Sequence, residues 1–168
     1  MEIWDGYYKD GRPAGIDLVR GGERIKNLFH LTCEVLVRHA DGDYLLMKRS
    51  LQKDAYPGFY EATAGGAAQK GEDAIACIKR ELREKTGLEC EEFQEIAFNA
   101  FDKSGTLCHS FVCTVNCDKD SVKLQEGETE GFMWLSESEF IEFLASELVI
   151  NTQKERYIEF FKKMGYVN

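Results

Sequence analysis

The 168-residue sequence contains no long hydrophobic run, and this absence argues against a membrane-spanning helix. No apolar segment approaches the ~20 residues that such a helix needs. The first ten residues, MEIWDGYYKD, are polar and acidic, and they lack the basic start and apolar stretch of a secretion signal. The sequence therefore predicts a cytoplasmic protein with no membrane partner.

Positive charge is also scarce. Lys and Arg total 21 against 30 Asp and Glu, so the formal net charge is −9 at pH 7. A nucleic acid polymer is bound largely through its phosphates, which need a basic protein surface, so we expect no such partner. A small phosphorylated substrate remains compatible with this charge, because a metal ion and a few local basic residues can outweigh the net charge.

Paired cysteine motifs are missing as well. The six cysteines occur singly, no C-x2-C pair is present, and the three histidines form no ligand-spaced cluster with them. This pattern argues against a zinc site. Together with the missing secretion signal it predicts six reduced thiols. They are Cys33, Cys77, Cys90, Cys108, Cys113 and Cys117.

The residues that are present predict one α/β domain spanning 1–168. Hydrophobic residues make up 43% of the chain, and no repeat or linker interrupts it. In the strand predicted over 31–39, Leu36 alone breaks the alternation of apolar and polar residues. Strands followed by a loop and helix, further strands and further helices indicate helices packed on a sheet. Strands are expected over 1–8, 15–18, 31–39, 44–47, 60–63, 95–101, 106–115 and 132–135. Helices are expected over 74–85, followed by Gly87 as a left-handed C-terminal cap, from a capping box of Ser136 and Glu139 to about Leu144, and from a cap at Asn151 or Thr152 onward.

Residues 66–88 combine a flexible glycine-rich loop with the first of these helices. Glu81 and Glu84 are three residues apart, so both carboxylates lie on one helix face. Two carboxylates beside such a loop suit a hard cation such as Mg²⁺. The alternative is a solvated face with ordinary i,i+4 ion pairs, Glu81 with Lys85 and Arg80 with Glu84, and the helix alone favours that alternative.

The spacing favours the metal site, because the segment resembles the box of the Nudix hydrolases, G-x5-E-x7-R-E-U-x-E-E-x-G-U, where U is a bulky aliphatic residue. Eight of the nine specified positions match, and Lys85 stands at the ninth, where the pattern has a metal-binding Glu. The matching residues are Gly66, Glu72, Arg80, Glu81, Leu82, Glu84, Gly87 and Leu88.

The resemblance covers roughly residues 28–145 and implies an α/β/α sandwich around a mixed β-sheet. It makes the chain a single Nudix domain with an N-terminal extension over 1–27, the Nudix box over 66–88 and an added C-terminal helix over 146–168. The extension resembles one found in a subset of Nudix proteins that also looks like isopentenyl diphosphate isomerases.

The resemblance also implies an activity and its residues. Nudix proteins typically hydrolyse a nucleoside diphosphate linked to another group, using Mg²⁺ or Mn²⁺. In this family a glutamate from a loop near the C-terminal end of the domain often joins the site. Glu128 is the expected residue here, with Glu126 and Glu130 as alternatives. The alternative without a function is that this acidic loop is simply solvated. Lys48 and Arg49 either face phosphate or are solvated charges at a strand end. The implied metal ligands are Glu81, Glu84, Glu128 and a carbonyl near Gly65; Arg80 orients a carboxylate, and Lys48, Arg49 and Gly66 contact substrate.

Lys85 is the departure that decides how far this activity is preserved. Repulsion between an ammonium and a divalent ion ~4–6 Å apart amounts to several kcal/mol at an effective dielectric constant of ~20. This argues against two metals and for one, held by Glu81, Glu84 and a late-loop glutamate. Two functions stay open: a weakened or single-metal pyrophosphohydrolase, and a non-catalytic domain that binds a nucleotide-like ligand, with Lys85 replacing the metal's charge.

An isopentenyl diphosphate isomerase is disfavoured. The isomerases use a Cys and a nearby His just before the box helix, and the corresponding stretch here, TAGGAAQKG, has neither. The expected binding partner is a small phosphorylated substrate. Association of the chain with a second copy as a homodimer also stays open. The sequence of the loops does not indicate which substrate is bound.

Overall fold

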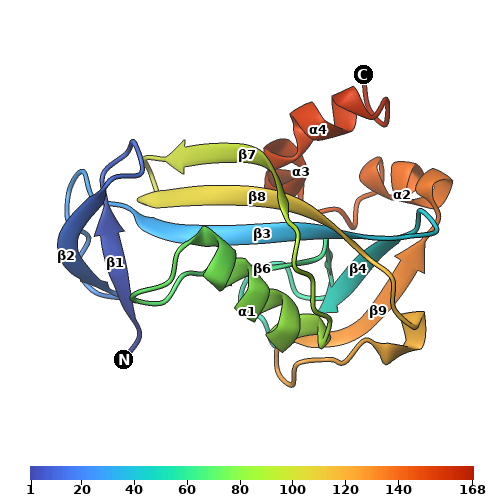
Figure 1. Cartoon of the computed structure of the whole chain (residues 1–168), viewed down its shortest axis with the longest axis horizontal. Helices are drawn as coiled ribbons and strands as arrows, with labels where there is room; N and C mark the ends of the chain where they lie inside the picture. Colours follow the sequence, from blue (N-terminus) through green and yellow to red (C-terminus); the bar gives the residue numbers. More distant parts are fainter.

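A mixed sheet forms the centre of the computed structural model, which describes residues 1–168 (Figure 1). Its central strand β3 (His30–His39) runs parallel to β8 (Thr106–Val115) along its whole length. The other strands are β4 (Tyr44–Arg49), β5 (Tyr60–Glu61), β6 (Ala64–Ala67), β7 (Gln94–Phe101) and β9 (Thr129–Leu135). The strand order is β5-β4-β3-β8-β7, with β6 beside β3 and β9 beside β4, and every pair other than β3 with β8 is antiparallel. The predicted α/β fold with a mixed sheet is confirmed.

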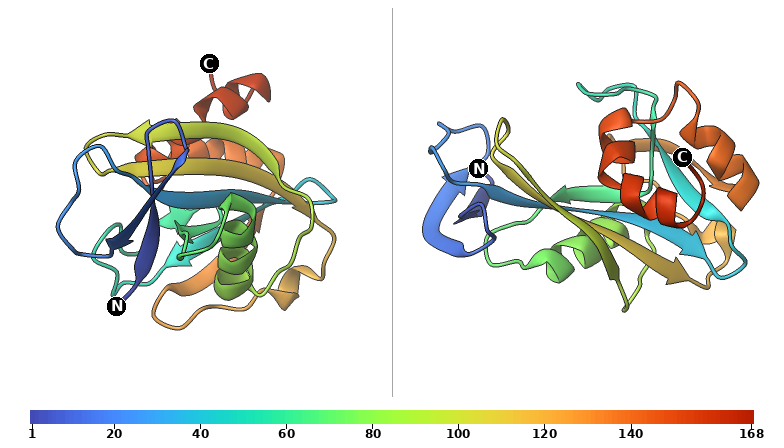
Figure 2. Two further views of the ribbon diagram at one scale, coloured as in Figure 1. Left: turned by 60° about the vertical axis from the view of Figure 1, so that its left-hand side comes forward. Right: turned by 90° about the horizontal axis from the view of Figure 1, so that it is seen from above.

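Helices cover both faces of this sheet, as the view from above shows (Figure 2). Neighbouring residues of a strand point to opposite faces, so Val35 and Val37 of β3 enter one core and Leu36 enters the other. The first core packs under α1, and the second packs under the C-terminal helices. Leu36 therefore breaks the alternation because β3 is buried on both sides. The helices are α1 (Ala74–Thr86), α2 (Glu137–Leu144), α3 (Asn151–Arg156) and α4 (Ile158–Lys163), with a short 3-10 helix at Lys119–Ser121.

The N-terminal residues form a separate two-stranded sheet, β1 (Ile3–Tyr7) and β2 (Pro13–Val19), at one end of the molecule (Figure 1). This hairpin holds the loop that leads into α1. The backbone N–H of Lys70 donates to the Ile3 carbonyl at 3.0 Å, and the N–H of Gly71 donates to Asp5 Oδ2 at 2.7 Å. The extension thus fixes the loop that precedes the box helix.

The box segment differs from the expected loop in one respect. Residues 64–67 form a strand, β6, that pairs with β3, although small residues favour flexibility. A Cβ atom on Gly65 would lie 2.6 Å from the Cys33 carbonyl oxygen, so glycine permits this close pairing. The helix itself is as predicted. Asp73 caps it by accepting from the Ala76 N–H, and Gly87 ends it in the left-handed conformation at φ 71°.

The C-terminal region confirms one predicted cap and corrects another. Ser136 and Glu139 form the predicted capping box at the start of α2, which ends at Leu144. The last helix, however, has Asn151 as its first residue and no side-chain cap, and it breaks at Tyr157 into α3 and α4.

Two further properties bear on the predictions from sequence. All six cysteines are free thiols, as expected. None of the helices is both long enough and apolar enough to cross a membrane.

Candidate active site

Arg80 ties the box loop to the box helix. Its Nε and Nη2 atoms donate to the two oxygens of Glu72 at 2.7 and 2.9 Å, and Nη2 also donates to the Ala67 carbonyl at 3.0 Å. Its Nη1 atom donates to Glu81 Oε1 at 2.7 Å and to Glu84 Oε2 at 3.2 Å. The hydrogen bonds from Arg80 hold the pKa of Glu72 below its usual value. Arg80 therefore orients all three carboxylates of the box.

The Glu81 carboxylate is packed against the glycine that opens the box. The residue is only 8% exposed, and a Cβ atom on Gly66 would lie 2.3 Å from Glu81 Oε1. Any side chain at this position would displace the carboxylate. The first glycine of the motif is thus required by the position of its first helical glutamate.

A polar cleft of about 480 Å³ brings most of the predicted site residues together. It lies between β6, α1 and the loop before β9. Lys48 does not line it, because its ammonium points away to Glu130 Oε1 at 3.0 Å, and Glu126 does not line it either. The predicted residues that do line it are Arg49, Gly65, Gly66, Arg80, Glu81, Glu84 and Glu128.

Lys85 also lines this cleft, but its partner differs from the expected one. Lys85 makes no ion pair with Glu81, which pairs with Arg80 instead. Lys85 Nζ lies 3.7 Å from Glu61 Oε2. The side chains of Lys85 and Glu61 are only 11% and 12% exposed. Arg49 makes a short ion pair with the other oxygen of Glu61. The expected pair of Arg80 with Glu84 is present.

Glu128, the predicted late-loop residue, reaches the cleft with its own cation. Lys53 Nζ donates to both of its oxygens, at 2.7 and 2.8 Å. Partial burial raises the pKa of Glu128, but the hydrogen bonds and charge of Lys53, together with the charges of Lys85 and Arg49, outweigh burial and lower the pKa below its usual value. Glu128 is therefore ionised at neutral pH.

Glu61 and Lys53 are among the cleft residues that were not predicted from the sequence. Glu61 occupies a two-residue strand, and Lys53 lies in the loop between β4 and β5. Neither belongs to a motif, and both reach the cleft only through pairing of distant segments, so the sequence holds no signal for them.

Cations and carboxylates balance within the cleft. Five of each line it, and every carboxylate has a cationic partner within 4 Å. No three His, Cys, Asp or Glu side chains are grouped as a metal-binding cluster. The carboxylates are Glu2, Glu61, Glu81, Glu84 and Glu128, and the cations are Arg20, Arg49, Lys53, Arg80 and Lys85.

The donor atoms nevertheless fit one hard divalent cation. Glu81 and Glu84 each use a single oxygen for Arg80 and keep the other without a hydrogen-bond partner. Mg²⁺ is commonly bound by one or two carboxylates and completes its coordination with water and substrate phosphate. This donor set suits such an ion better than a cage built entirely from protein ligands.

Comparison with known proteins identifies the family. Residues 28–158 match the NUDIX domain. The chain belongs to the Nudix family. The match reaches past residue 145, the expected limit, and includes α3.

Two relatives are named as uncharacterized Nudix hydrolases. PA4841 of Pseudomonas aeruginosa is 30% identical over 130 residues, which are 77% of this chain and 72% of the relative. The protein lmo0368 of Listeria monocytogenes is 30% identical over 88 residues, which are 52% of each chain, so the match spans about half of that relative.

Solved structures show the same fold. DR0079 from Deinococcus radiodurans has a TM-score of 0.68 at 16% identity, covering 93% of this chain and 99% of its own. The NUDIX domain of Shewanella oneidensis NrtR, complexed with ADP ribose, has a TM-score of 0.56 at 12% identity, covering 73% of this chain and 80% of its own. The Nudix fold thus carries the Nudix box in this chain.

Proposed function

We propose that this Nudix protein is a metal-dependent pyrophosphohydrolase that acts on a nucleoside diphosphate linked to another group, or on a similar small diphosphate. The observation that carries the proposal is the convergence of Glu81, Glu84 and Glu128 on one cleft beside Gly65 and Gly66. The ADP ribose bound to the NrtR domain belongs to this class of compound and supports it.

Glu81 and Glu84 would hold a Mg²⁺ or Mn²⁺ ion, joined by a carbonyl near Gly65 and by Glu128 once it leaves Lys53. When bound, the ion neutralises diphosphate charge and lowers the pKa of its water. Glu128 is ionised at neutral pH, so it can alternatively accept a proton from the attacking water.

Basic side chains of the cleft would bind the phosphate oxygens. Arg49, Lys53 and Lys85 all line the cleft, and each already pairs with a carboxylate. An incoming diphosphate would replace those carboxylates as partner and release Glu128 from Lys53. Arg80 has a different role, because it orients Glu81 and Glu84.

A second candidate function is a binding domain without catalysis. The charge balance of the cleft favours it, because five basic residues match five carboxylates there and every carboxylate already makes an ion pair. In that case Lys85 supplies the positive charge that a metal would provide.

The six free thiols also support our proposal that the protein works in the reducing cytoplasm.

The test is a hydrolysis screen over nucleoside diphosphate derivatives with Mg²⁺ and with Mn²⁺. We expect hydrolysis to phosphate-ester products only when a metal ion is added. Glu81→Gln should lower kcat at least about a hundredfold, as does the loss of one preorganised electrostatic group in other enzymes. Glu91→Gln is the matched control, since Glu91 is 86% exposed and lies outside the cleft. Ligand binding without turnover under either metal would establish the binding domain instead.

A further inference from the structure

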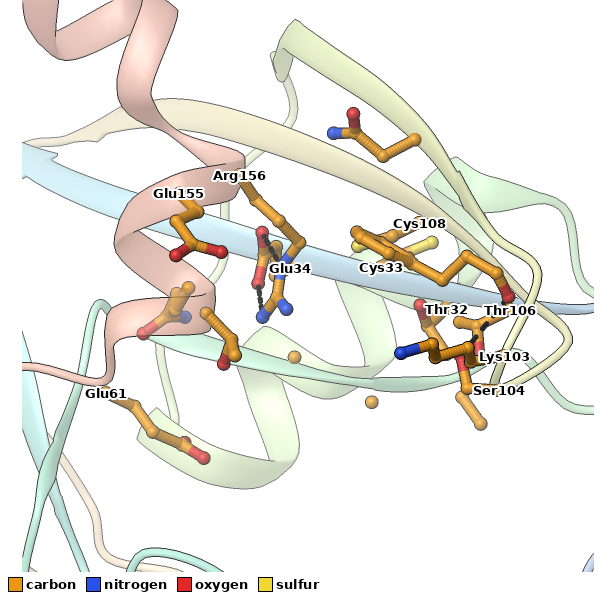
Figure 3. A pocket seen from close by; sticks show the side chains of 17 residues that line it. Thr32, Cys33, Glu34, Glu61, Lys103, Ser104, Thr106, Cys108, Glu155 and Arg156 are labelled. Atoms are coloured by element: carbon orange, nitrogen blue, oxygen red, sulfur yellow. Dashed lines mark hydrogen bonds and ion pairs between the residues drawn. The ribbon is translucent and has the colours of Figure 1, made fainter.

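A second cleft, of about 1060 Å³, adjoins the box cleft. Strand β6 separates the two, and both are lined by the same four residues: Glu61, Gly65, Gly66 and Ala67. A molecule whose diphosphate lies at the box can therefore extend across the glycines of β6. The second cleft lies between the sheet and α3, next to the turn that joins β7 and β8 (Figure 3).

The floor of this cleft is a partly buried ion pair, and its arginine keeps one N–H donor free. Arg156 of α3 donates through Nε and Nη2 to the two oxygens of Glu34, at 2.8 and 2.7 Å. Glu34 also accepts from Ser110 Oγ at 2.7 Å, and its side chain is only 5% exposed. Arg156 Nη1 has no hydrogen-bond partner, so a fixed guanidinium can donate to a ligand.

The walls carry hydrogen-bond donors and acceptors that have no partner in the protein. The Glu155 carboxylate and the Asn99 amide make no hydrogen bond or ion pair, and neither does the Lys103 ammonium. Figure 3 shows Glu155 beside Arg156 on one turn of α3, and Lys103 at the far end of the cleft with Ser104 and Thr106. A free carboxylate and a guanidinium N–H at one end, and an ammonium at the other, surround the same space.

Aromatic surface is nearly absent from this lining. Phe101 is the single aromatic residue, and it is 37% exposed at the end of β7. A nucleobase is usually held by stacking on aromatic side chains. A hydroxylated, non-aromatic group instead needs many dispersed donors and acceptors, which this cleft supplies.

We propose that the second cleft binds a sugar or other polyol attached to the diphosphate, with Glu155 and Asn99 hydrogen-bonded to its hydroxyl groups. This inference rests on the proposed function, since the phosphate end of the same ligand lies at the box. It assigns specificity to α3, the helix at the C-terminal limit of the family match.

Two phosphates that differ only in the attached group test the inference. Glucose 1-phosphate carries a polyol, and phenyl phosphate carries an aromatic ring without hydroxyl groups. Binding of each to the full chain is measured by calorimetry in the presence of Mg²⁺. We expect glucose 1-phosphate to bind about tenfold more tightly, as one or two added hydrogen bonds to charged groups predict.

Variants locate the difference. Glu155→Ala should weaken glucose 1-phosphate binding about tenfold and leave phenyl phosphate unchanged. Glu155 is exposed in the cleft, so its removal does not endanger folding. The matched control is Glu159→Ala, since Glu159 is an exposed carboxylate on α4 that pairs only with Lys162. Asn99→Ala provides a second, uncharged variant with the same expected direction.

Equal or tighter binding of phenyl phosphate overturns the polyol assignment, as does failure of both compounds to bind, or an equal effect of Glu155→Ala and Glu159→Ala. The hydrolysis screen is a separate readout. If no diphosphate is hydrolysed but glucose 1-phosphate binding depends on Glu155, the proposed catalysis fails and the polyol cleft stands.

Discussion

The surroundings of single residues explain how a lysine is tolerated at a position that the Nudix box reserves for glutamate. Lys85 is nearly buried, and it is neutralised by Glu61 from β5, a residue outside the box. Glu81 is neutralised separately by Arg80. The substitution is therefore compensated across the cleft by a carboxylate from outside the box.

Lys85→Glu is predicted to raise metal affinity at the box. The change removes a cation from the cleft and adds an oxygen ligand. Repulsion between one positive charge and a divalent ion ~4–6 Å away amounts to at least about 1.4 kcal/mol, so its removal should lower the Kd for the metal about tenfold or more. Titration with Mn²⁺ measures it. Lys79→Glu is the matched control, because Lys79 lies on the same helix but pairs with Glu91 outside the cleft. Equal Mn²⁺ affinity in both variants would show that Lys85 does not act on the metal.

At the scale of elements, the sequence predicted those parts whose signals are local. The capping box of α2 and the terminal Gly87 of α1 are local hydrogen-bonding devices, and both were placed correctly. Strand β6 was missed because Ala64–Ala67 has no strand propensity, and pairing with β3 decides its conformation. The break at Tyr157 was missed for a similar reason, since burial of its ring against the sheet fixes the helix there.

The predicted site divides along the same line. The polar residues Arg80, Glu81 and Glu84 follow from a spaced motif, and all three line one cleft. Lys48 and Arg49 could not be separated by sequence, because a strand turns successive side chains to opposite faces and the motif does not fix which one faces the cleft. Arg49 lines it, and Lys48 pairs with Glu130 outside.

Gly66→Ala tests the contact between β6 and α1. A Cβ atom there would lie 2.3 Å from Glu81 Oε1, so either the strand or the carboxylate must move. Overpacking of this kind costs about 1–3 kcal/mol, and any hydrolysis should fall with it. Urea unfolding measures the loss. Gly131→Ala is the control, because its Cβ would meet Lys48 Cβ at an ordinary 3.7 Å, and an equal loss there would refute the role of the contact.

At the scale of the whole molecule, the thiols report which parts of the chain are closed to solvent. Cys33, Cys77, Cys108 and Cys113 are buried, and Cys90 and Cys117 are partly exposed. Burial raises the pKa of Cys108 to about 11 and holds that of Cys113 well above its usual value, so neither forms a reactive thiolate at neutral pH.

A thiol titration should accordingly show two populations. In native protein we expect two thiols, Cys90 and Cys117, to react rapidly with a disulfide reagent and four to react slowly. After denaturation without reductant all six should react, because none is paired. Fewer than six reactive thiols in freshly prepared protein would contradict the assignment, and Cys90→Ser should remove one fast-reacting group.

Acid should unfold the molecule through the carboxylates that basic residues hold in the ionised form. The clearest is Glu72, whose pKa in the folded protein lies below the ordinary value of 4.5 because Arg80 donates to both of its oxygens. Since folding lowers this pKa, ionised Glu72 stabilises the fold above about pH 4.5, and the contribution is lost as the pH falls through the folded-state pKa. Glu2 and Glu128 change in the same direction.

Glu72→Gln should therefore cost stability at neutral pH and little in acid. We expect the free energy of unfolding to fall by about 1–3 kcal/mol at pH 7, the usual effect of losing hydrogen bonds to a charged group. The gap to wild type should close as the pH falls below 4.5 and through the folded-state pKa of Glu72, because the wild-type carboxylate is then itself protonated. Urea unfolding at each pH measures the gap. Glu159→Gln, at an exposed pair with Lys162, should change stability by less than about 1 kcal/mol at any pH. A gap for Glu72→Gln that stays constant from pH 7 to the onset of acid unfolding would show that Arg80 stabilises the fold through contacts other than this ion pair.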